Sequence, residues 1–119
     1  MQILVIEDEL LIQKSLKKLL EKKGASVDVS STGKLAIDML INNNYDRIIC
    51  DLMLQDITGF DIIEESKKKY SIEEISSLFI IMTAYSSPQI LEKAKSYGCK
   101  VLSKPFEDIQ EAIEIFIKK

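Results

Sequence analysis

Short apolar runs alternate with longer amphipathic segments along the whole of this 119-residue chain. The runs are of strand length, and strands that alternate with helices form a parallel sheet with helices on both faces. Right-handed crossovers between parallel strands then leave only a few possible arrangements. The alternation therefore predicts an α/β fold but does not define the order of its strands. The expected strands are residues 2–6, 25–29, 47–50, 78–82 and 100–103.

Apolar residues recur at helical spacing in the segments between these runs. Gly24 and Gly98 stand where helices often end, and Ser87 followed by Pro88 is typical of a helix start. Lysines 67–69 are expected in the last turn of the third helix, where positive charge suits the helix dipole. The expected helices are residues 9–23, 32–41, 59–69, 88–97 and 107–118.

Four of the expected strands end on polar residues that phosphate chemistry uses. Glu7 and Asp8 follow the first strand, and Asp51 follows the third. Thr83 follows the fourth strand, and Lys104 follows the fifth. Open α/β sheets bind ligands outside the carboxyl ends of their strands. We therefore expect these side chains to meet at one edge of the sheet.

Three carboxylates at one edge would repel each other and raise one another's pKa. Mg²⁺ relieves this repulsion, because it binds carboxylate oxygens and keeps a position free for a phosphate oxygen. Asp51 is the candidate nucleophile, since a carboxylate can accept a phosphoryl group as an acyl phosphate. Lys104 offers a compact positive charge and Thr83 a hydroxyl donor. Each residue taken singly is typical of a cap or turn, but the ordered set predicts phosphoryl chemistry.

The composition argues against several other functions. The net charge of −3 disfavours a nucleic-acid-binding surface, which needs a basic face. The chain has no histidine, which removes Ser-His and Cys-His hydrolysis and most zinc sites. Cys50 and Cys99 lack metal-site spacing and are expected to be reduced, buried thiols. No run matches a signal peptide or a membrane span, so we expect a cytoplasmic protein.

Four short motifs in this order resemble the receiver domain of two-component response regulators. They are IED at residues 6–8, DLM at 51–53 with Gly59 eight residues after Asp51, MTA at 82–84 and KPF at 104–106. The resemblance covers the whole chain, so residues 1–119 are expected to form one receiver domain. It implies a flavodoxin-like (βα)5 fold with the parallel strand order 2-1-3-4-5.

The resemblance also implies a role for each site residue. Asp51 would accept a phosphoryl group from a phosphohistidine on a sensor histidine kinase or a phosphotransfer protein. Thr83 and Lys104 would contact the phosphoryl oxygens, and the bond from Lys104 to Pro105 would be cis. Mg²⁺, or Mn²⁺ in its place, would be held by Glu7, Asp8, Asp51 and the backbone carbonyl of Met53, with Asp8 as the first choice for a direct ligand.

The chain departs from the usual family pattern at three positions. The first residue of the acidic pair is Glu7, whose side chain reaches further than that of an aspartate. Gln55 stands where many family members have proline, which would make the loop after Asp51 more flexible. Val101 stands where the family usually has an aromatic ring that moves with the threonine. Tyr85 occupies a position that influences phosphate lifetime, and its bulk is expected to shield an acyl phosphate from water.

The leading hypothesis is a phosphorylation-dependent switch and not an enzyme acting on external substrates. Its only reactions would be its own phosphorylation and dephosphorylation. Modification of Asp51 would change how the face of the fourth helix, fifth strand and fifth helix binds a downstream protein or a missing output domain. We expect no direct contact with nucleic acid or membrane, and either a monomer or a phosphorylation-promoted dimer.

Three alternatives stay open at this point. A receiver-like module that binds its partner without phosphorylation is favoured by Val101 and opposed by the intact set of site residues. A phosphohydrolase would need a second acid where Met53 stands. A flavin-binding protein would need a phosphate-binding first loop, but the acids at residues 7–9 would repel a phosphate.

Overall fold

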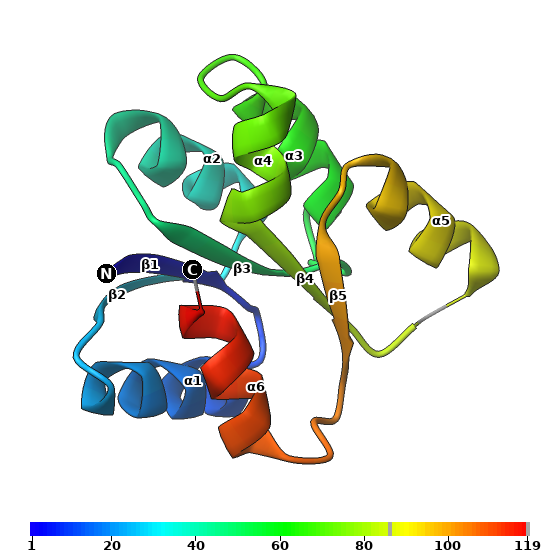
Figure 1. The fold of residues 1–119 in the computed structure, drawn as a ribbon. Helices are drawn as coiled ribbons and strands as arrows, with labels where there is room; N and C mark the ends of the chain where they lie inside the picture. The colour runs from blue at the N-terminus through cyan, green and yellow to red at the C-terminus, as the bar shows by residue number, and fades with distance from the viewer. Residues whose placement is uncertain (86, 119) are drawn as a thin grey trace.

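The five strands form one parallel sheet in the order β2-β1-β3-β4-β5 (Figure 1). The computed structural model describes residues 1–85 and 87–118. The order agrees with the one implied by the resemblance, and the α/β fold class is confirmed. The strands are β1 Gln2–Ile6, β2 Ser26–Ser30, β3 Arg47–Asp51, β4 Phe79–Thr83 and β5 Lys100–Ser103.

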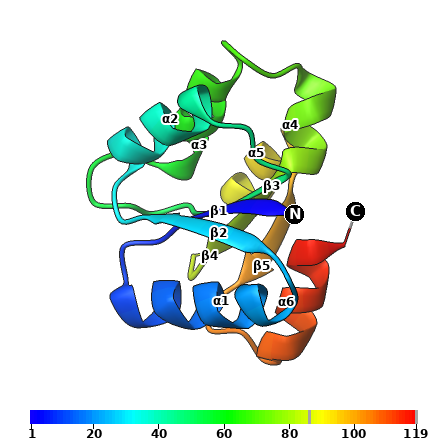
Figure 2. The same ribbon diagram turned by 90° about the vertical axis from the view of Figure 1, so that its left-hand side faces the viewer.

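Helices cover both faces of the sheet, as Figures 1 and 2 show. α1 and α6 pack on one face, and the other four helices pack on the opposite face. The bounds are α1 Leu10–Lys22, α2 Gly33–Asn42, α3 Gly59–Ser66, α4 Ile72–Leu78, α5 Pro88–Ser96 and α6 Ile109–Ile117. Among the described residues, no helix combines the length and the apolar character that a bilayer crossing requires.

Alternation of side chains along the strands divides the core into two layers. Ile3 and Val5 of β1 pack toward α1 and α6, whereas Leu4 and Ile6 pack toward α2 and α3. Every residue of the central strands β3 and β4 is buried, and the interior positions of both strands are apolar. The edge strand β5 is only partly covered.

The third expected helix was predicted too long, and one helix was missed. α3 ends at Ser66, and lysines 67–69 lie in the turn that follows it. α4 begins after Ser71, whose side chain accepts from the amide of Glu74 while the Glu74 carboxylate accepts from the amide of Ser71. This reciprocal capping box starts a new helix immediately before β4.

The lysine run after α3 has a specific contact that the sequence did not predict. The ammonium of Lys69 donates to the carbonyls of Leu40, Ile41 and Asn43, at 3.0, 3.1 and 2.6 Å. These carbonyls belong to the carboxyl end of α2, where backbone acceptors lack partners within the helix. Lys69 was expected in the last turn of the third helix; it lies after that helix and contacts the end of α2.

Both cysteines are buried free thiols, as expected. Burial raises the pKa of the Cys99 thiol to about 11 and raises that of Cys50 still further. Both side chains therefore stay protonated at neutral pH and contribute to packing.

Candidate functional site

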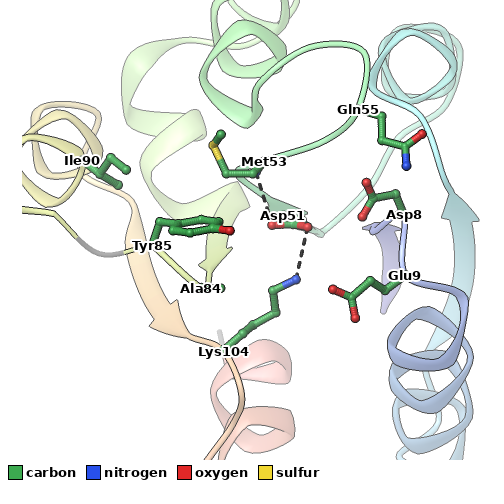
Figure 3. A pocket seen from close by; sticks show the side chains of 9 residues that line it. All are labelled: Asp8, Glu9, Asp51, Met53, Gln55, Ala84, Tyr85, Ile90 and Lys104. Carbon is green, nitrogen blue, oxygen red and sulfur yellow. Dashed lines mark hydrogen bonds and ion pairs between the residues drawn. The ribbon is translucent and has the colours of Figure 1, made fainter.

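A cleft of about 730 Å³ opens at the carboxyl ends of the strands (Figure 3). This is the edge where an open α/β sheet binds its ligands. Four loops contribute to its wall, from β1, β3, β4 and β5. The lining residues are Asp8, Glu9, Asp51, Met53, Gln55, Ala84, Tyr85, Ile90 and Lys104.

Three carboxylates converge beside this cleft, and two of them, Asp8 and Asp51, line it. Ile6 pairs with Cys50 across β1 and β3, so the residues that follow on each strand, Glu7 and Asp51, come side by side. Glu7, Asp8 and Asp51 each offer a carboxylate oxygen, and these oxygens lie within 4.8 Å of one another. Glu7 and Asp51 are buried, whereas Asp8 is partly exposed and faces the cleft.

Lys104 joins the two buried carboxylates. Its ammonium lies 3.1 Å from both oxygens of Glu7 and 3.1 Å from Oδ2 of Asp51. Its backbone amide donates to the carbonyl of Thr83 at 2.9 Å, which fixes the chain at the end of β5. The side chain is 8% exposed, so the ammonium exchanges most of its water contacts for carboxylate contacts.

The pKa values of Glu7 and Lys104 are both raised, through different balances of burial and charge. Burial raises the pKa of Glu7 to about 7, the charge of Asp51 adds to that effect, and Lys104 opposes it. For Lys104, burial alone lowers the pKa, but hydrogen bonds and attraction from Glu7 and Asp51 outweigh burial and raise it. The cluster therefore favours the charged form of its lysine and makes its buried glutamate easier to protonate than a free carboxyl group.

The donor set fits a hard divalent cation. All three side chains offer carboxylate oxygens, the ligands that Mg²⁺ and Mn²⁺ prefer. Asp8 extends from the partly exposed side of the cluster, where an ion can keep several of its waters. Of the side chains predicted for the metal and for the phosphoryl group, those of Glu7, Asp8, Asp51 and Lys104 come together, whereas the hydroxyl of Thr83 bonds elsewhere.

Thr83 is fully buried at the end of β4, and its hydroxyl does not contact Asp51. It donates to the carbonyl of Tyr85 and accepts from the amide of Tyr85, both at 2.9 Å. Tyr85 itself is 64% exposed, and Figure 3 shows it and Asp8 on opposite sides of Asp51. To donate to a group bound at Asp51, this hydroxyl would first have to release its bond to the Tyr85 carbonyl, because a hydroxyl has one proton.

The two ends of the loop that follows Asp51 are joined by backbone contacts. The amide of Gly59 donates to the carbonyl of Leu52 at 2.8 Å, and Met53 forms an antiparallel bridge with Thr58. The amide of Met53 also donates to Oδ1 of Asp51 at 3.3 Å. Asp51 thus receives a hydrogen bond on each carboxylate oxygen, one from this loop and one from Lys104.

Gln13 is a site-supporting residue that the sequence reasoning missed. Its buried amide donates to the backbone carbonyl of Glu7 at 2.9 Å and to Oγ of Ser31 at 3.2 Å. A signal was present, because Gln13 shares the buried stripe of α1 with Leu16 and Leu20. A glutamine within an apolar stripe indicates a buried polar contact.

The Lys104–Pro105 peptide bond is cis, as the resemblance implied. Val101 lies on β5, partly buried against the core on the α5 side of the sheet. An aliphatic side chain in this position fills space among apolar neighbours and has no ring to exchange between inward and outward positions.

Comparison with known families decides what this arrangement is. The family model of the response regulator receiver domain matches residues 3–115. The chain is a response regulator receiver domain. The matched range begins at the second residue of β1. It includes the rest of that strand, all of the other strands, the acidic cluster and Lys104.

Curated relatives carry a similar receiver sequence within longer chains. The Aerobic respiration control sensor protein ArcB of Escherichia coli strain K12 is 36% identical over 119 residues, which are 100% of this chain and 15% of that protein. Response regulator ArlR of Staphylococcus haemolyticus is 36% identical over 106 residues, which are 88% of this chain and 46% of that protein. This receiver domain therefore spans less than half of either relative.

A solved structure has the same fold. The non-phosphorylated HemR receiver domain from Leptospira biflexa superposes with a TM-score of 0.83 at 28% identity, covering 96% of this chain and 90% of that one. The receiver fold predicted from the motifs is thus found both in the sequence family and in three dimensions.

Proposed function

We propose that this receiver domain accepts a phosphoryl group on Asp51 in a reaction that depends on Mg²⁺ or Mn²⁺. The donor would be a phosphohistidine on a sensor histidine kinase or on a phosphotransfer protein. The observation that carries the proposal is the contact of Lys104 with Glu7 and Asp51, beside the partly exposed Asp8. A cluster of this composition suits phosphoryl transfer, which mainly needs positioning and neutralised charge.

In the proposed step, an oxygen of the Asp51 carboxylate attacks the phosphorus of the donor. An O–P bond forms as the N–P bond breaks, and the electron pair of that bond stays on the imidazole nitrogen. Lys104 neutralises charge at the reacting oxygens, and the amide of Met53 holds the second carboxylate oxygen. The product is an acyl phosphate, and no water or redox partner takes part in its formation.

Glu7, Asp8, Asp51 and the backbone carbonyl of Met53 are the proposed ligands of the ion. When bound, it would offset part of the negative charge of the three carboxylates and of the transferred group, and Lys104 would offset a further part. Glu7 must be ionised for this role, and the pKa of about 7 puts its ionisation close to physiological pH.

The modified state would signal through Thr83. Its hydroxyl would give up the two bonds to Tyr85 and donate to a phosphoryl oxygen, which moves the start of the segment leading to α5. Phosphorylation would thus shift the balance between two conformations of the face made by α5, β5 and α6. That face would bind a downstream protein or an output domain in the cytoplasm, with the domain monomeric or forming a dimer on phosphorylation.

Incubation with Mg²⁺ and acetyl phosphate tests the proposal, with intact-protein mass spectrometry as the readout. We expect a gain of one phosphoryl group, lost when Mg²⁺ is chelated and absent in Asp51→Asn. Asp38→Asn is the matched control, because it removes an exposed carboxylate outside the cleft. A gain that persists in Asp51→Asn, or no gain in the wild type, would defeat the proposal and favour a constitutive binding module.

A further inference from the structure

The loop between β3 and α3, residues 52–58, is attached at both its base and its tip. At the base, Gly59 bonds to Leu52 and Met53 bridges to Thr58, as described above. At the tip, the carboxylate of Asp56 reaches helix α2. Loops of this length are ordinarily among the mobile parts of a domain, so a double attachment needs an explanation.

The tip contact joins residues far apart in the sequence. Oδ1 of Asp56 accepts from the amide of Gly33 at 2.9 Å, and Oδ2 accepts from the amide of Lys34 at 3.0 Å. These amides are the first two of α2 and have no partner within the helix. Each carboxylate oxygen therefore takes its own backbone donor, in a two-point contact that fixes the direction of the Asp56 side chain.

Close packing beside this contact shows that the loop is seated on α2. A Cβ atom at Gly33 would lie 2.3 Å from Cγ1 of Ile57 and 3.3 Å from Oδ1 of Asp56. Only a residue without a side chain permits such an approach of the loop to the helix. The backbone bonds to Gly33 and Lys34 also hold the pKa of Asp56 below its usual range, so the contact persists across neutral pH.

We propose that Asp56 is a positioning residue for the ion site. It holds residues 52–58 against α2, so that Met53 keeps its place beside Asp51. The inference rests on the proposed function, since it assumes that Met53 contributes to an ion held by the three carboxylates. Its physical basis is preorganisation: a loop already ordered in the free protein does not have to be ordered by the ion.

A simpler role for Asp56 would be to cap α2 and nothing more. Thr32 provides the control that separates the two roles. Its hydroxyl accepts from the amide of Leu35 at 3.3 Å, so it caps the same end of the same helix from within the local sequence. Loss of Thr32 weakens the helix start but leaves the loop attached.

The experiment titrates Mg²⁺ alone into the wild type, Asp56→Ala, Asp56→Asn and Thr32→Ala. Calorimetry gives the Kd, and the backbone amide signal of Met53 in NMR reports the loop. We expect Asp56→Ala to raise the Kd about tenfold, as for other groups that orient a metal ligand without touching the metal. For Thr32→Ala, the Kd for Mg²⁺ should stay within about twofold of the wild-type value. Thr32 does not hold the loop, and substitutions at separate sites usually affect each other by no more than this. Asp56→Asn keeps one carbonyl acceptor and should fall between them.

The urea midpoints of the two alanine variants provide the internal check. Both should fall, because each variant removes a cap from α2. If the Kd changes equally in both, or in neither, Asp56 acts only as a cap and the inference is overturned.

Failure of the proposed function has a different signature. A wild type that binds Mg²⁺ but takes no phosphoryl group from acetyl phosphate would defeat phosphorylation, while the Kd ratios would still decide the role of Asp56. A wild type that binds no Mg²⁺ would overturn both.

Discussion

The two loops that flank Asp51 are held in different ways. The β3–α3 loop reaches α2 through Asp56, across 22 and 23 residues of sequence. In the β4–α5 loop, the side-chain bonds of the described residues are local: Thr83 pairs with Tyr85, and Ser87 caps the amide of Ile90. The first loop is attached to another element of the fold, whereas the second is supported mainly by its own neighbours.

Under the proposed function, this difference separates two tasks of the site. The proposed ion site would gain from a loop that is already ordered, because order present before binding lowers the cost of binding. Under the proposed function the Thr83 hydroxyl would have to rearrange, and local bonds can be exchanged without disturbing the rest of the fold. Helix α5, which follows this second loop, is also lightly packed, because Ala94 is the one buried residue among its residues 88–96. Beyond its end, the ring of Tyr97 stacks on Phe60 of α3 with centroids 5.9 Å apart.

The most severe test of the attached loop is Gly33→Ala. The added methyl would collide with Ile57, and we expect a loss of about 1–3 kcal/mol in unfolding free energy from this overpacking. Urea denaturation measures it. Adding Ile57→Ala should recover part of the loss, since the double variant removes the collision. Strictly additive losses in the double variant would show that the loop is not seated on α2 as described.

The charge state of Glu7 gives the next largest effect. With a pKa near 7, Glu7 is mostly protonated at pH 6 and mostly ionised at pH 8. Mg²⁺ should therefore bind about tenfold more weakly at pH 6 than at pH 8, and binding near pH 7 should release protons. Calorimetry in buffers of different ionisation enthalpy measures both quantities. Glu7→Gln should show a much flatter pH dependence; an equally steep one would assign the titration to another group.

The same pKa determines whether the unfolding free energy of the metal-free protein rises or falls with pH. Glu7 has a higher pKa folded than the value of 4.5 that applies unfolded. Between pH 4.5 and about 7 the folded state holds more protons than the unfolded state, so the unfolding free energy falls as the pH rises. The stabilisation linked to Glu7 is fully present below pH 4.5 and is lost as the pH rises through about 7.

The local bonds of the second loop are tested by Thr83→Val. Removing the hydroxyl eliminates both contacts with Tyr85, at an expected cost of about 1 kcal/mol in unfolding free energy. The Kd for Mg²⁺ should stay within about twofold of the wild type, because Thr83 belongs to the other side of the site. A Kd that weakens as much as in Asp56→Ala would remove the distinction between the two loops.

The smallest expected effect concerns Tyr85. If its exposed ring shields an acyl phosphate on Asp51 from water, Tyr85→Ala should shorten the phosphate half-life about threefold, less than 1 kcal/mol of barrier. Loss of label from phosphorylated protein measures it, with Tyr85→Phe as the control that keeps the ring. An unchanged half-life in the alanine variant would refute the shielding role.

Local sequence patterns were sufficient for the sheet and for most of the acidic edge. β3 and β4 are buried throughout, so their apolar runs are visible without any knowledge of the fold. Glu7 and Asp51 were predictable because each closes such a run, and parallel strands bring their carboxyl ends together. The strand order itself came from the family resemblance.

What the sequence did not reveal are contacts between distant residues and one short helix. Asp56 and Lys69 look like ordinary surface charges until α2 is placed beside them. Gln13 makes one of its two contacts with Ser31, 18 residues away in the sequence, and only the fold brings these two residues together. α4 was missed because the lysines after α3 continue a helical composition, and the capping box from Ser71 to Glu74 was the signal that should have divided the segment.

Helix α2 is held at its two ends by opposite charges from the two flanks of α3. Asp56, just before α3, accepts from the first amides of α2, and Lys69, just after α3, donates to its last carbonyls. Each charge has the sign that the helix dipole favours at that end. To separate α2 from the sheet, the protein must break contacts at both ends of α3 as well. The two helices should therefore open as one cooperative unit, with slow amide protons of α2 and α3 exchanging with deuterium at a common free energy.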